Sequence, residues 1–123
     1  MGWKKAPPAV VAVFEALVPK RPDVQRRQMF GYPAAFVNGR MFAGLHEDRL
    51  VLRLDDQAIA AAKRRGAIDF EPMSGRAMTG WVAVPRRLLA DEDVVRGWID
   101  AAFRHVASIP AKKPRGGRRP RAR

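Results

Sequence analysis

Two carboxylates, Asp69 and Glu71, stand out because neither a helix cap nor a turn accounts for them. They lie two residues apart in a predicted strand, so both side chains project from one face. Paired carboxylates can act as general acid and base. Together with Met29, Tyr32 and Arg76 they would line a cleft for a small ligand or for the substrate of a weak enzyme. A solvated strand face accounts for the same two acids, and we favour that interpretation.

The other groups capable of chemistry have simpler structural explanations. Acidic residues 55–56 and 91–93 precede apolar helical segments, where carboxylates cap helix N-termini. His46 and His105 lack the spacing of a metal-ligand pair, and Ser74 lacks the preceding glycine of a nucleophile elbow. The chain has no cysteine, which excludes a thiol nucleophile and a cysteine-based zinc site. We therefore expect no catalytic residue, no metal and no cofactor, and hence no enzyme.

Hydrophobic periodicity predicts the elements that position these residues. Helical spacing predicts helices over residues 9–18, 56–65 and 91–106, with Gly66 closing the second one. Alternation predicts strands over residues 34–37, 40–46, 49–54, 68–73 and 79–84, and a further short strand over residues 24–30. The pair Asn38-Gly39 suits the positive φ angles of a two-residue hairpin.

These elements predict an α+β fold with one antiparallel sheet of about five strands and helices packed on it, in the order α-β-β-β-α-β-β-α. We expect one domain over residues 1–109 and a tail over residues 110–123. A chain of 123 residues is long enough for one hydrophobic core. The apolar runs fall far short of the ~20 residues that cross a membrane, and no signal peptide is recognisable. We therefore expect a cytoplasmic protein without membrane contact.

The formal net charge of +12 comes mainly from the tail, because residues 111–123 hold seven basic residues and no acid, which leaves +5 on the rest. The basic residues are Lys112, Lys113, Arg115, Arg118, Arg119, Arg121 and Arg123. Interspersed proline and glycine predict disorder in this tail. Such an arm can bind nucleic acid by counterion release, without sequence preference. A purely solubilising tail is the alternative.

Three blocks of sequence, QMFG at 28–31, FVNGRMFA at 36–43 and LVLRLDD at 50–56, resemble the N-terminal domain of TfoX-like proteins. Matches at WVAVP (81–85) and Trp98 extend the resemblance, which covers roughly residues 24–106. It implies a secretion-chaperone-like α+β fold and no catalytic residue. The family includes regulators of natural competence that act with a transcription factor through protein contacts. Those regulators carry a second, helical domain, for which this chain leaves no room, so we do not expect the competence role itself to carry over.

Two functions remain open. The first is a non-enzymatic regulatory domain that binds an unknown protein partner, as a transcription-related accessory protein whose tail reinforces contact with nucleic acid. The second is a ligand-binding or weakly enzymatic domain with a cleft near Met29, Tyr32 and Arg76. An enclosed pocket with convergent polar groups would favour the second, and a filled core with an open surface the first. Exposed sheet edges would also allow a homodimer.

Overall fold

The structure of the protein is a computed structural model that describes residues 5–29, 31–71 and 76–110. Its elements are α1 (Pro8–Leu17), β1 (Val24–Met29), β2 (Tyr32–Val37), β3 (Arg40–His46), β4 (Arg49–Arg53), α2 (Asp56–Arg64), β5 (Ile68–Asp69), β6 (Trp81–Val84), the 3-10 helix η1 (Arg86–Ala90) and α3 (Glu92–Ser108). The six strands form one antiparallel sheet in the spatial order β1-β2-β3-β4-β6-β5. The predicted α+β fold with a single antiparallel sheet is confirmed.

The sheet differs from the prediction in two details. It has six strands rather than about five, because residues 24–29 pair along their whole length with β2. Strand β5 ends at Asp69, short of the predicted 68–73, and β6 begins at Trp81 rather than at residue 79. The chain leaves the ladder here because the Phe70 carbonyl accepts a hydrogen bond from the Met78 N–H (2.8 Å) and Gly80 adopts a φ of 88°.

Tight turns join the first four strands. Asn38 and Gly39 have φ angles of 55° and 78°, which confirms the hairpin predicted from this pair. Glu47 also has a positive φ, 57°, in the two-residue turn between β3 and β4. Gly31, with a φ of 84°, precedes Tyr32, the first residue of β2. These short connections make β1 to β4 a continuous meander.

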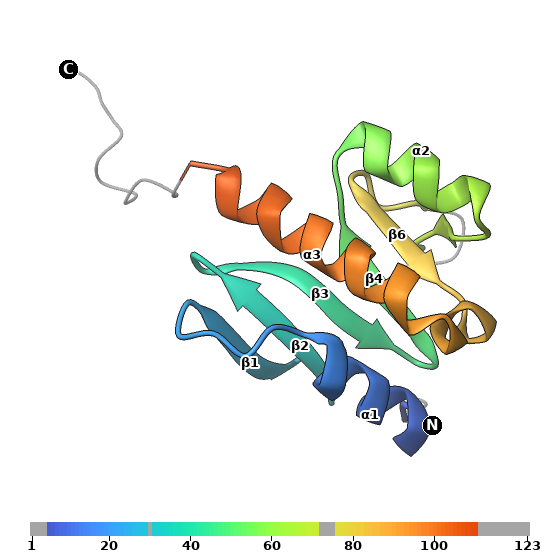
Figure 1. The fold of residues 1–123 in the computed structure, drawn as a ribbon, viewed down its shortest axis with the longest axis horizontal. Helices are drawn as coiled ribbons and strands as arrows, with labels where there is room; N and C mark the ends of the chain where they lie inside the picture. The colour runs from blue at the N-terminus through green and yellow to red at the C-terminus, as the bar shows by residue number, and fades with distance from the viewer. Residues whose placement is uncertain (1–4, 30, 72–75, 111–123) are drawn as a thin grey trace.

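One face of the sheet carries the helices and the hydrophobic core (Figure 1). Helices α1 and α3 lie side by side over this face and contribute Val10, Phe14 and Ile99 to the core. Alternation in β4 directs Leu50 and Leu52 toward them, as the period-two pattern predicts. We call this the helix face.

A bulge in β3 turns Phe42 toward the helix face. Ala35 of β2 pairs with Ala43, but the next residue, Phe36, pairs with Met41, so Phe42 is an extra residue in β3. Its ring is fully buried and packs edge-on against Phe103 of α3, with the centroids 5.5 Å apart at 79°. The bulge therefore adds a large aromatic side chain to the sheet–helix contact.

Arg21 connects the start of the sheet to the end of α3. Its guanidinium lies over the Phe103 ring, 4.7 Å from the centroid, and forms two hydrogen bonds with the Asp23 carboxylate at 2.9 and 3.1 Å. The hydrogen bond from Arg21 lowers the pKa of Asp23 below its ordinary value. The stabilisation from this pair is therefore complete above the usual carboxyl range and is lost as the pH falls through the lowered pKa.

Gly97 lies in the middle of α3 and is exposed, with no atom within 4 Å of the position that a Cβ would take. Glycine inside a helix costs about 0.5–1 kcal/mol relative to alanine. Gly97→Ala is therefore expected to raise the free energy of unfolding by about that amount. Urea unfolding followed by circular dichroism measures the change, and a destabilised variant would show that the position is less open than the structure indicates.

Candidate interaction surface

The acidic residues singled out in the sequence have structural partners in most cases. Asp55 and Asp91 each accept a hydrogen bond from a backbone N–H in the first turn of α2 and α3, at 2.8 and 3.4 Å. The interpretation of these acids as helix caps is confirmed. Asp69 forms an ion pair with Lys63 of α2, on the helix face, whereas Glu71 forms none with a described residue; both side chains are exposed. Lys63 thus accounts for one of the two carboxylates that suggested acid–base chemistry.

The five residues of the suggested cleft do not gather at one point. Met29 and Tyr32 are neighbours, paired across β1 and β2, and project from the face opposite the helices. Asp69 projects from the helix face. Glu71, two residues after the end of β5, and Arg76 are both exposed. A ligand cleft at these residues stays a prediction. Ser74 and the basic residues at 112–123 lie outside the described residues.

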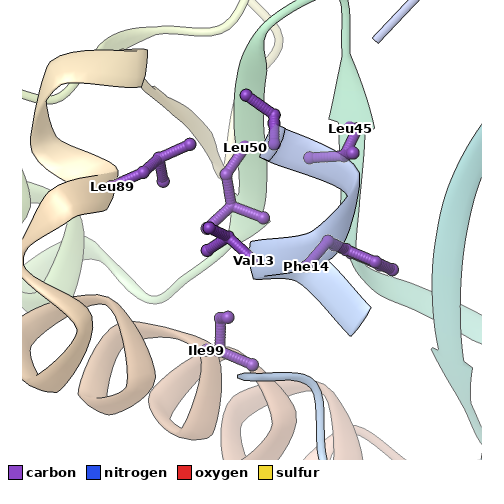
Figure 2. A pocket seen from close by; sticks show the side chains of 7 residues that line it. Val13, Phe14, Leu45, Leu50, Leu89 and Ile99 are labelled. Carbon is purple, nitrogen blue, oxygen red and sulfur yellow. The ribbon is translucent and has the colours of Figure 1, made fainter. Parts of the chain in front are cut away.

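Neither of two hollows formed by the described residues resembles a substrate pocket. The one in Figure 2 lies between α1, β3, β4, η1 and α3, is lined by seven apolar residues and has no room for a water molecule. An open groove of about 580 Å³ runs between the end of α1 and the first half of α3. Among the described residues, no charged side chain is buried and no three metal-ligating side chains cluster.

The face of the sheet opposite the helices is the most distinctive surface, and we call it the open face. No helix that the structure describes packs on it (Figure 1). Strand alternation and the observed registers assign its larger side chains. They are Arg27, Met29, Tyr32, Phe36, Met41, His46, Arg49, Arg53, Ile68 and Trp81.

Four rings form a continuous row on the open face, which we call the aromatic belt. The Tyr32 and His46 centroids are 5.6 Å apart, those of His46 and Phe70 5.4 Å, and those of Phe70 and Trp81 6.3 Å. His46, Phe70 and Trp81 are half-buried, whereas Tyr32 is only 4 % exposed. The belt therefore joins strands from both halves of the sheet and is partly accessible to solvent.

A row of smaller residues crosses the open face, and larger side chains lie over them, close to the backbone of the sheet. The positions of Ala34, Gly44, Val51 and Ala83 fall in one row across β2, β3, β4 and β6. A Cβ on Gly44 would overlap the terminal methyl group of Met41, so the Met41 side chain lies over this glycine. These four residues are therefore buried by larger side chains of the same face, although no described helix covers them.

The strands give the open face a positive charge. Its alternating positions carry Arg27, Arg49 and Arg53 and no acidic residue. Arg49 is ion-paired with Glu47 at 3.3 Å, in the turn beside it. Arg27 lies over the Phe36 ring, 4.8 Å from the centroid, and makes no ion pair with a described residue; the same is true of Arg53. Two guanidinium groups therefore have no carboxylate partner within the described part of the domain.

Exposed apolar side chains lie at the borders of the same surface. Met29 is 38 % exposed, Ile68 44 % and Met78 42 %. Met29 and Ile68 belong to the two edge strands, and the Met78 N–H binds the Phe70 carbonyl next to the aromatic belt. Exposed apolar groups near aromatic rings and arginines are typical of protein interaction sites.

The aromatic belt was not predicted from the sequence, where its residues are dispersed. Tyr32, His46, Phe70 and Trp81 come from separate segments, and only the strand order β2-β3-β4-β6-β5 brings them together. The available signal was the alternation in each strand, which places Arg49 and Arg53 opposite the core leucines. Strand pairing across the sheet was needed to connect these positions.

By its architecture the protein is a two-layer α+β domain with helices on one side of an antiparallel sheet. The family model for the TfoX N-terminal domain matches residues 15–106, which include the entire sheet, and the chain belongs to this family. Comparison with curated proteins finds no match. None of the described helices is long and apolar enough to span a bilayer.

Proposed function

We propose that the protein is a non-enzymatic regulatory domain that binds a protein partner, as a transcription-related accessory protein in the cytoplasm. Membership of the TfoX N-terminal family supports a regulatory role. The observation that carries the proposal is the open face. Partly exposed aromatic rings lie there beside Arg27 and Arg53, which form no ion pair with a described residue, and no helix that the structure describes covers them. Binding of a protein partner to such a surface is favourable in free energy, because it removes apolar area from water.

We further propose that the basic tail strengthens this role by binding nucleic acid. The seven basic residues between positions 112 and 123 lie outside the described residues, so their composition alone supports this step. Binding through such a tail is electrostatic and indifferent to base sequence. The domain would supply the specific contact and the tail a general attraction to DNA or RNA.

An affinity capture with the intact protein and with a variant lacking residues 111–123 tests both steps. Each sample is divided, and one half is treated with nuclease. In the nuclease-treated half, we expect one protein partner to remain bound to both forms. In the untreated half, we expect the intact form alone to retain nucleic acid. If every retained protein disappeared after nuclease treatment, the proposed protein contact would be wrong.

A further inference from the structure

We propose that the open face binds an acidic protein segment that also carries apolar side chains. This inference rests on the proposed function and deepens it, because it assigns both the surface and the chemistry of the partner. The apolar side chains would contact the aromatic belt, and the carboxylates would pair with Arg27 and Arg53.

The apolar half of the proposal follows from exposure. Met29 and Ile68 are 38 % and 44 % exposed, at the two edges of the sheet. The half-buried rings of His46, Phe70 and Trp81 lie between them in continuous contact. An apolar segment laid across the strands would cover all of these groups at once, and burial of aromatic residues provides much of the binding energy at protein interfaces.

The charged half follows from the absence of acids among the alternating positions of this face. Arg27 is held over the Phe36 ring and hydrogen-bonds the Gln25 side chain at 2.9 Å, so its position is partly fixed before a partner arrives. Arg53 is half-buried beside Trp81, its partner in the β4–β6 ladder. A guanidinium group can bind a carboxylate through two parallel hydrogen bonds. Carboxylates on the partner would therefore complement both arginines.

Ring geometry favours a protein over single-stranded nucleic acid as the occupant. Bases stack on exposed, flat ring faces. Here Tyr32 and Phe36 are 4 % and 7 % exposed, and successive rings of the belt are inclined to one another at 49°, 68° and 55°. The most exposed apolar groups are the aliphatic and thioether side chains of Ile68, Met29 and Met78, which cannot stack with bases.

The charge of the open face and the composition of the edge strands disfavour a second copy of the chain as the occupant. Two open faces in contact would bring Arg27 and Arg53 close to the same arginines of the other copy, and no acidic residue occupies the alternating strand positions of this face. Pairing through the sheet edges is disfavoured as well. The edge strand β1 has the sequence VQRRQM, with charged and polar side chains on both faces, and the other edge, β5, has two residues.

The test uses the full-length protein, immobilised and offered a display library of random 12-residue peptides. The open-face variant is R27E/R53E, and the matched control is R64E/R86E, which makes the same change in net charge. Arg64 and Arg86 are exposed, make no ion pair with a described residue, and belong to α2 and η1. All three proteins retain the basic tail, so attraction between the tail and acidic peptides is equal in each.

We expect the wild type to enrich peptides that combine Asp or Glu with Leu, Phe, Ile or Met. R27E/R53E should raise the dissociation constant of the best peptide at least about tenfold, and R64E/R86E less than about twofold. Ile68→Ser, at an exposed position, should weaken the same peptide while the circular dichroism spectrum stays unchanged.

Enrichment without acidic residues, or equal loss of binding in both double variants, would overturn the inference. Binding of a 12-nucleotide oligothymidylate that R27E/R53E abolishes and R64E/R86E preserves would show that the surface serves nucleic acid instead. Failure here is distinguishable from failure of the proposed function. A partner that is captured equally by wild type and R27E/R53E would leave the regulatory role intact and remove only the assignment to the open face.

Discussion

Replacing Phe42 by alanine is expected to lower the free energy of unfolding by about 3–5 kcal/mol, the usual cost of truncating a fully buried phenylalanine. Phe42 is 0 % exposed and packs edge-on against Phe103. The bulge in β3 fixes this orientation, so a cavity at the sheet–helix contact has little opportunity to collapse. Arg21 would also lose part of its support, because it lies over the same Phe103 ring. Urea unfolding at neutral pH, followed by circular dichroism, measures the effect.

Met78→Ala is the matched control for this substitution. Its side chain is 42 % exposed, so the loss of stability should stay within about 0.5 kcal/mol. A loss below about 1 kcal/mol for Phe42→Ala would contradict the burial of this ring and the placement of the bulge.

Removal of residues 111–123 is expected to abolish salt-sensitive binding to DNA. If all seven basic residues contact phosphates, the logarithm of the binding constant should fall with the logarithm of the salt concentration with a slope of about −6. Affinity would then decrease roughly 10³-fold or more between 50 and 200 mM salt. Fluorescence anisotropy with a labelled duplex of arbitrary sequence, at several salt concentrations, measures the slope for both forms.

A variant with the tail charges reduced rather than deleted separates charge from chain length. Replacing Arg118, Arg119, Arg121 and Arg123 by glutamine leaves three basic residues in the tail. The slope should then fall to about −3, with the length of the chain unchanged. An intact protein that does not bind duplex DNA at ~50 mM salt would contradict the proposed role of the tail.

Local chemistry was enough to predict most of the fold. Asn38-Gly39 specified a hairpin because both residues tolerate a positive φ, and the structure has 55° and 78° at these positions. Asp55 and Asp91 marked the helix starts because a carboxylate there binds free N–H groups. Alternation of leucine and arginine in β4 identified its core side.

Other features depend on contacts between distant segments and were not predictable in this way. The bulge at Phe42 is a register shift between two strands, and the residue types at this position do not predict it. The end of β5 depends on the hydrogen bond between Phe70 and Met78. The aromatic belt likewise requires the crossover that places β6 between β4 and β5. The residues of the suggested cleft were selected by type from two separate stretches of sequence, and strand pairing was needed to show that Met29 and Tyr32 lie on the sheet face opposite Asp69.

Contact between the open face and its partner is tested most directly by nuclear magnetic resonance of the full-length protein with ¹³C-labelled methionine methyl groups. The chain has five methionines, and Met29 and Met41 lie on the open face. Their signals can be assigned with the variants M29L and M41L. On addition of the captured partner or the selected acidic peptide, we expect both signals to shift or broaden, and R27E/R53E to prevent the change. A ligand that binds while both signals stay unchanged would contradict the assignment of the open face as the interaction surface.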